Sequence, residues 1–105
     1  MARLSVKEAM AAVVATGGDF ARLLERPSCD VSLYKPLGVD PQKPHLKDEL
    51  YVIASGSGRF ECQGGTEHFG PGDVFFVAAG TEHRFADFSS DFATWVIFLG
   101  PRPSN

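Results

Sequence analysis

Short stretches in which apolar and polar residues alternate recur along this chain, and glycine or proline lies between them. In the segment 29–34, for example, Cys29, Val31 and Leu33 alternate with three polar or aromatic residues. A period of two is typical of a strand with one buried face. The predicted strands cover 29–34, 44–53, 59–63, 66–69, 74–77 and 92–99, and 81–85 follows the turn at Gly80. This pattern predicts an all-β fold, a closed barrel or two-sheet sandwich of six to eight strands.

One segment near the start has helical periodicity instead. Its apolar residues recur at the i, i+3, i+4, i+7 and i+8 positions of a single stripe, which predicts an amphipathic helix over 4–15. Ser5 and Glu8 form a capping-box pair at its start, and Gly17 ends it. Residues 20–24 fit either a short strand or a further helical turn. We therefore expect one domain, with the helix in 1–18, a barrel in 19–100 and a tail in 101–105.

Composition and charge exclude several classes of partner. The chain has 105 residues, 44% of them hydrophobic, and its net charge of −3 comes from interspersed charges. The sequence has no stripe of basic residues, which argues against nucleic acid or an anionic membrane as its main partner. It also has no apolar run that approaches the length of a membrane span. The separation of Cys29 and Cys62 in the sequence matches no metal-binding or redox-active cysteine motif. Without an export signal, free thiols and a cytoplasmic location are predicted, and a single disulfide between the two cysteines stays open.

The candidate chemistry begins with His45 and Glu49, which lie four residues apart at the start of a β-rich segment. Side chains at i and i+4 of a strand point to the same face, and Tyr51 and Ile53 continue that face. An imidazole and a carboxylate that project together make a metal ion the first hypothesis to test.

The region around this pair resembles the first motif of the cupins, a conserved jelly-roll β-barrel family. Gly38 begins the motif, His45 fills its second histidine position, Glu49 follows after three residues, and Gly56 closes it after six more. The first histidine position falls on Lys43, and the spacing from Gly38 is one residue short.

The second cupin motif is matched by Gly72, Gly80 and His83 at the usual spacings. Ala78 stands where proline is usual, and Asp87 where asparagine is usual. The two motifs cover about half of the chain, and the sequence is identified as a small, bacterial-type, single-domain member of the family.

The resemblance implies a divalent metal held by His45, Glu49 and His83, a 2-His-1-carboxylate set with open coordination positions. Iron, manganese, nickel, zinc or copper could occupy it. Lys43 is a poor substitute ligand because coordination requires it to lose its proton. Gln42 could coordinate weakly if the loop register shifts. In the alternative reading the site has decayed, and the barrel binds an organic ligand without metal.

Strand parity assigns roles to further residues. Tyr51 shares the face of Glu49, where it either orients a substrate or fills the barrel. Phe85 shares the face of His83 and is expected on the cavity wall. Trp95 is either a pocket wall or part of the core. Four other polar or reactive residues are expected to be ordinary strand or turn residues: Asp48, Cys62, His68 and Asp87.

Two function classes follow. The first is a metal-dependent cupin that acts on an unidentified small molecule, as a dioxygenase, an isomerase or a decarboxylase. The second is a non-catalytic barrel that binds a small ligand. The resemblance also implies a homodimer, to which the apolar helix stripe and the Phe-rich last strand could contribute.

Overall fold

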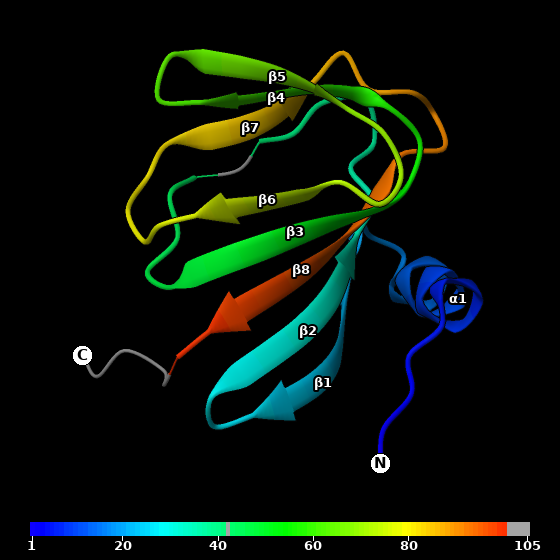
Figure 1. Cartoon of the computed structure of the whole chain (residues 1–105). Coiled ribbons are helices and arrows are strands. Elements are labelled where there is room, and N and C mark those ends of the chain that lie inside the picture. Colours follow the sequence, from blue (N-terminus) through cyan, green and yellow to red (C-terminus); the bar gives the residue numbers. More distant parts are fainter. Residues whose placement is uncertain (42, 101–105) are drawn as a thin grey trace.

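The computed structural model describes residues 1–41 and 43–100, in which one helix and eight strands form two facing antiparallel sheets (Figure 1). One sheet has the order β1-β2-β8-β3-β6, and the other has the order β5-β4-β7. This arrangement confirms the predicted all-β fold with one N-terminal helix. Gln42 and the predicted tail lie outside the described residues. The elements are α1 Val6–Thr16, β1 Phe20–Arg26, β2 Cys29–Tyr34, β3 Asp48–Ser55, β4 Gly58–Cys62, β5 Gly65–Phe69, β6 Val74–Val77, β7 His83–Ala86 and β8 Ala93–Leu99.

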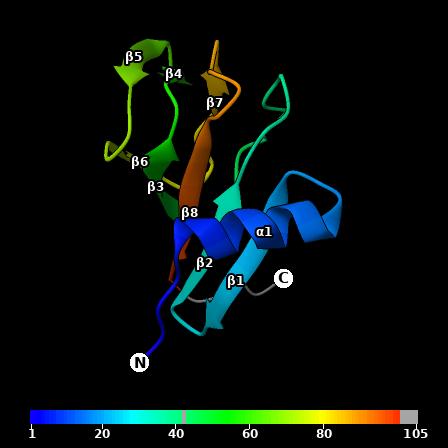
Figure 2. The same cartoon turned by 90° about the vertical axis from the view of Figure 1, so that its right-hand side faces the viewer.

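The helix α1 lies on the outer face of the five-stranded sheet, across β1 and β2 (Figure 2). The Ser5 side chain accepts a hydrogen bond from the Glu8 amide, as the capping box predicts, and Gly17 ends the helix with φ 73°. The buried stripe is narrower than predicted, because Ala9 and Val13 are buried while Val14 is 77% exposed. The helix thus covers only part of the sheet.

Two local predictions change in the structure. Residues 20–24 belong to a strand, β1, which continues to Arg26. The strand that carries Glu49 begins only at Asp48, so His45 precedes it in a loop. Prolines at 41 and 44 have no N–H to donate to a ladder, and the His45 carbonyl accepts its hydrogen bond from Gly80 rather than from a neighbouring strand.

Aromatic rings fill the space between the two sheets. Phe85 is at the centre, with ring centroids 4.8 Å from Tyr51, 4.9 Å from Phe60 and 4.8 Å from Phe92. Burial of each such ring stabilises the fold by about 1.5–3 kcal/mol. This cluster holds the strands that carry Glu49 and His83 against each other.

The residues of each strand in the larger sheet divide between its two faces. On β3, Glu49, Tyr51 and Ile53 all point inward and are at most 2% exposed, as predicted. On β8, Val96 points inward, whereas Trp95 packs with the residues under α1 on the outer face. Of the two roles that the sequence leaves open for Trp95, this position supports packing.

The glycine that closes the first motif is required by a close approach of two chain segments. Gly56 has φ 82°, and a Cβ atom there would stand 2.5 Å from the Cα of Phe92. Any larger residue would push the end of β3 away from the segment before β8.

Candidate metal centre

His45, Glu49 and His83 come together between the two sheets. His45 comes from the loop before β3, Glu49 is the second residue of β3, and His83 is the first residue of β7. The Glu49 Oε1 atom is 3.8 Å from His45 Nε2 and 3.0 Å from His83 Nε2. One ligand atom from each residue lies within 4.8 Å of the others. The structure thus brings together the three residues that the two motifs predict.

The loop that carries His45 is fixed although it contains no regular element. The Gly80 amide donates a hydrogen bond of 2.8 Å to the His45 carbonyl, and the Ala79 amide donates one of 2.8 Å to Asp48 Oδ1. Asp48 is exposed and is the first residue of β3. These contacts tie the two motifs to each other, so the spacing of His45 from Glu49 does not depend on a shared strand.

His83 has the orientation of a metal ligand. Its Nδ1 atom is 2.8 Å from the Thr81 carbonyl, which can only accept, so Nδ1 carries a proton and donates. In the neutral ring Nε2 then has a lone pair, and this atom faces Glu49 Oε1 and the Tyr51 hydroxyl, which is 2.8 Å away. A main-chain carbonyl that fixes the tautomer in this way is common behind ligating histidines.

The charges at this centre are incompletely matched. Glu49 has a side chain only 1% exposed, and neither of its oxygens has a hydrogen-bond partner within the described part of the chain. Burial lowers the pKa of His83, but its contacts with Glu49 and with the Thr81 carbonyl outweigh burial and raise that pKa overall. A proton on Nε2 can therefore reside where a cation would otherwise sit between His83 and Glu49.

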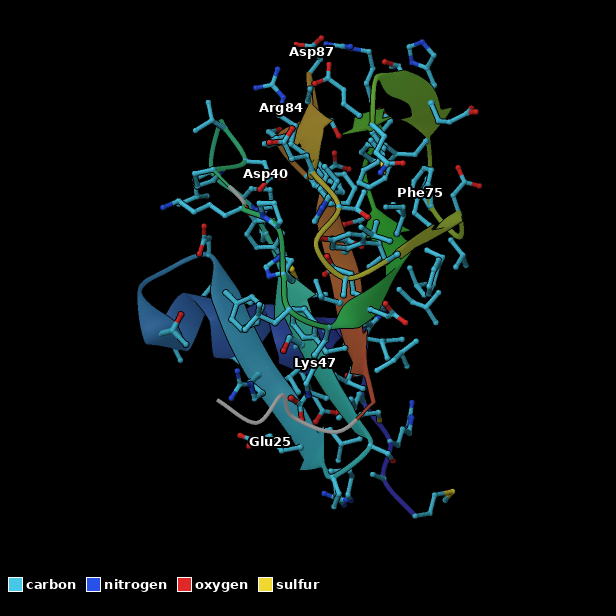
Figure 3. All side chains as sticks on the ribbon, turned by 90° about the vertical axis from the view of Figure 1, so that its left-hand side faces the viewer. Glu25, Asp40, Lys47, Phe75, Arg84 and Asp87 are labelled. Carbon is cyan, nitrogen blue, oxygen red and sulfur yellow. The ribbon has the colours of Figure 1, made fainter. Side chains whose placement is uncertain are left out.

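A second buried carboxylate, Asp40, lies on the loop between β2 and β3 (Figure 3). Asp40 Oδ1 accepts a hydrogen bond of 2.6 Å from the Tyr34 hydroxyl, and Oδ2 accepts one of 2.8 Å from the Phe85 amide. Burial, followed by the contact with Asp40, raises the pKa of Tyr34, which keeps this hydroxyl protonated and donating. Sequence reasoning missed this pair, because nothing in the spacing of Tyr34 and Asp40 marks it.

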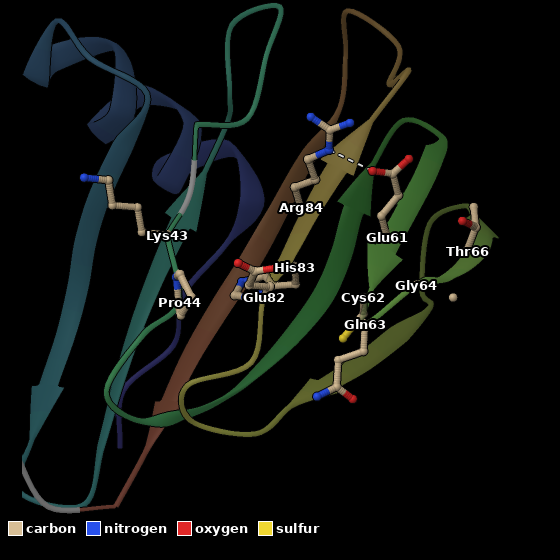
Figure 4. Close-up of a pocket in the computed structure, with 11 residues that line it drawn as sticks. Lys43, Pro44, Glu61, Cys62, Gln63, Gly64, Thr66, Glu82, His83 and Arg84 are labelled. Carbon is tan, nitrogen blue, oxygen red and sulfur yellow. Dashed lines mark hydrogen bonds and ion pairs between the residues drawn. The ribbon is translucent and has the colours of Figure 1, made fainter.

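Two cavities flank the centre. The larger, about 600 Å³, has polar walls and is called the polar cavity here (Figure 4). The smaller, about 260 Å³, is called the His45 cavity. The polar cavity is lined by Lys43, Pro44, Glu61, Cys62, Gln63, Gly64, Gly65, Thr66, Glu82, His83 and Arg84. The His45 cavity is lined by Asp19, Phe20, Tyr34, Pro41, His45, Val96 and Phe98.

Lys43 does not replace the missing histidine of the first motif. It is exposed, and its ammonium group points away from His83 (Figure 4). The other cation of the polar cavity, Arg84, donates a hydrogen bond of 2.7 Å to Glu61. The described donor set is therefore His45, Glu49 and His83, and Gln42, the other candidate, lies outside the described residues.

The other residues that the sequence analysis singled out lie outside the metal centre. Phe85 shares the inner face with His83, is 2% exposed within the aromatic core, and lines neither the polar cavity nor the His45 cavity. Cys29 and Cys62 are free thiols, and Cys62 packs against the core. His68 is exposed on β5, and Asp87 accepts a hydrogen bond from Arg59. Within the described residues, no helix is long and apolar enough to cross a membrane.

Comparison with known proteins supports the same fold. Residues 31–98 match the family described as the cupin domain. An uncharacterised protein of Streptomyces coelicolor is 34% identical over 89 residues, which are 83% of this chain and 85% of that protein. The structure of KdgF from Halomonas sp. has a TM-score of 0.69 at 19% identity, over 81% of this chain and 79% of that one. The DMSP lyase DddQ from Ruegeria pomeroyi has a TM-score of 0.68 at 23% identity, over 98% of this chain and 57% of that one.

Proposed function

The chain belongs to the cupin family, and from that premise we propose that it binds one divalent metal ion through His45, Glu49 and His83 and acts with it on a small molecule. The observation that carries this proposal is Glu49, a buried carboxylate whose oxygens have no hydrogen-bond donor among the described residues. A buried charge costs several kcal/mol unless it is paired, and a cation between Glu49 and the two imidazoles would pair it.

The neutral form of His83 also supports a cation at this point. With its Nδ1 proton donated to Thr81, its Nε2 lone pair faces a carboxylate oxygen at 3.0 Å, an arrangement that is repulsive without a positive charge between them. A dication satisfies both groups without a proton. The contacts of His83 with Thr81 and Glu49 therefore suit a bound metal ion better than they suit a neutral imidazole without one.

The donor set is compatible with several metals. Two imidazoles and one carboxylate suit iron(II), manganese, nickel, zinc or copper, and three protein ligands leave coordination positions open. A metal bound there would act as a Lewis acid toward an oxygen atom of the small molecule. Tyr51, whose hydroxyl is 2.8 Å from His83 Nε2, would donate a hydrogen bond next to that position. The reaction is then of the dioxygenase, isomerase or decarboxylase type.

A second candidate function is a metal-free barrel that binds a small ligand without catalysis. The contact that favours it is the 3.0 Å separation of His83 from Glu49, which a protonated imidazole also satisfies. The exposed position of Lys43, where many cupins have a ligand, favours it as well.

Metal analysis of untagged protein, grown with iron, nickel and manganese in excess, separates the two candidates. We expect close to one ion per chain in the wild type, and loss of that ion in His45→Ala and Glu49→Ala. His68→Ala is the matched control, because His68 is exposed and outside the centre. A wild type without metal, or triad variants that retain it, would exclude the first candidate.

For the assembly we propose a homodimer that uses the outer face of the five-stranded sheet. Val74 and Phe76 on β6 are 57% and 59% exposed there, and exposed apolar patches of this kind are typical of subunit contacts. Light scattering should give a dimer for the wild type and a smaller mass for Phe76→Ser. Leu37→Ser, which alters a loop residue that is 71% exposed, is the control and should stay dimeric.

A further inference from the structure

Access to the centre is asymmetric. Among its three residues only His45 has an exposed side chain, with 33% of its surface accessible, against 1% for Glu49 and 0% for His83. His45 lines the smaller of the two cavities. His83 borders the polar cavity, but its side chain has no accessible surface there. The accessible side of the centre is therefore that of His45, the residue that lines the His45 cavity.

The walls of the His45 cavity are mainly apolar. Phe20 and Phe98 face it from β1 and β8, together with Val96, and the Phe98 ring meets the His45 ring edge-on at 5.3 Å. Tyr34 adds a further ring, because its hydroxyl is already engaged by Asp40. The volume of about 260 Å³ exceeds that of the roughly 150 Å³ apolar cavities that hold benzene.

The charge of this cavity is one-sided. Among its described lining residues Asp19 is the only carboxylate, and none is a lysine or an arginine. The polar cavity differs, since both Arg84 and Glu61 line it and bond to each other. A carboxylate or phosphate in the His45 cavity would meet Asp19 without a cation to balance it.

We propose that the His45 cavity binds a compact, ring-sized apolar group of a molecule whose oxygen-donor head reaches the His45–Glu49–His83 centre. A polar substituent of this group that meets Asp19 is neutral or positively charged. This inference rests on the proposed function for the head of the molecule and on the cavity alone for the ring. The substrates are then small chelating molecules that carry one aromatic or branched apolar substituent.

The test uses a chelating head of constant chemistry with different tails. Cobalt(II)-loaded protein is titrated with acetohydroxamate, benzohydroxamate and 4-carboxybenzohydroxamate, and binding is followed by the visible spectrum of the cobalt. We expect benzohydroxamate to bind about tenfold or more tightly than acetohydroxamate, because its ring leaves water for the cavity. The carboxylate on the third probe should remove much of that gain.

Three variants test whether the tighter binding of benzohydroxamate depends on the His45 cavity. Phe20→Ala removes one wall of the cavity, so it should abolish the preference for the ring, measured as the ratio of the benzohydroxamate and acetohydroxamate affinities of the same variant. Phe88→Ala, a matched change at a half-buried ring outside the cavity, should keep the preference. Asp19→Asn should restore binding of the carboxylated probe. Equal binding of the first two probes, or a full ring preference in Phe20→Ala, overturns the inference.

Failure of the metal proposal has a different signature. If the wild type holds no cobalt, benzyl alcohol is titrated into the metal-free protein, and the methyl signals of Val96 are followed by NMR. Their movement in the wild type, and its loss in Phe20→Ala, would support the cavity even then. Unmoved Val96 signals overturn the inference, whatever the metal content.

Discussion

Two buried carboxylates, Asp40 and Glu49, have opposite surroundings. Asp40 has a donor for each oxygen, the Tyr34 hydroxyl for one and the Phe85 amide for the other. Glu49 has none within the described residues, and two histidine nitrogens lie beside it instead. A buried acid whose oxygens are satisfied by the protein serves structure. One whose oxygens are left open is available to a ligand, so the two should respond differently to the same chemical change.

The largest expected effect is on metal binding in Glu49→Gln. The substitution keeps the size of the side chain but removes the charge that attracts the ion. Metal affinity should fall by more than about 100-fold, since even residues that only support ligands cost 10- to 100-fold. At a pH above the raised pKa of His83, the metal-free variant should unfold at a denaturant concentration no lower than that of the wild type, because the substitution removes a buried charge that has no hydrogen-bond donor. Isothermal titration and urea unfolding measure the two quantities.

Asp40→Asn should show the reverse pattern. An amide nitrogen then faces one of the two donors, which leaves a buried polar group without an acceptor and costs about 1–3 kcal/mol of unfolding free energy. Metal affinity should fall by less than in Glu49→Gln, because only the seating of the His45 loop changes. A large loss of affinity with unchanged stability would reverse the roles assigned to the two acids. The same urea and calorimetric series decides.

Tyr34→Phe removes a single donor from Asp40 and leaves the Phe85 amide in place. We expect a loss of about 0.5–1.5 kcal/mol in unfolding free energy and unchanged metal stoichiometry. In the Asp40→Asn background the same change should cost less, since its partner is already impaired. Additive losses would mean that the hydroxyl and the carboxylate do not act on each other.

The smallest expected effect is a pH dependence of the stability of the metal-free protein, which arises from the contact of His83 with Glu49. Although burial opposes protonation, Glu49 and Thr81 raise the pKa of His83, so the folded protein holds a proton that the unfolded chain has already released. Stability of the metal-free protein is therefore full below the ordinary value of about 6.5 and falls as the pH rises through the raised pKa. Metal affinity should rise over the same window. Glu49→Gln should flatten the unfolding profile, and a profile that rises with pH would contradict the assignment.

The sequence predicts the composition of the centre better than its local structure. The spacing of His45 and Glu49 suggested a pair, and the match of Gly38, Gly56, Gly72 and Gly80 to the two cupin motifs added His83 to it. The sequence did not show that His45 precedes the strand. That depends on the Gly80 amide reaching its carbonyl across the barrel, which is a tertiary contact.

Other features depend on partners that are distant in the chain. Asp40 is 45 residues from the Phe85 amide it accepts from, and no local pattern links them. Strand parity placed Phe85 on the inner face correctly but could not separate the core from a cavity wall. For Trp95, parity left open which face α1 would cover, and the helix covers the side of Trp95.

The position of Trp95 has a practical consequence for spectroscopy. It is the only tryptophan of the chain, and it lies under α1 on the face of the sheet opposite to the centre. Its fluorescence should therefore report the detachment of the helix and be nearly silent to occupants of the barrel. A ligand screen based on tryptophan emission would miss true binders, whereas the same signal would isolate detachment of the N-terminal helix from the rest of unfolding.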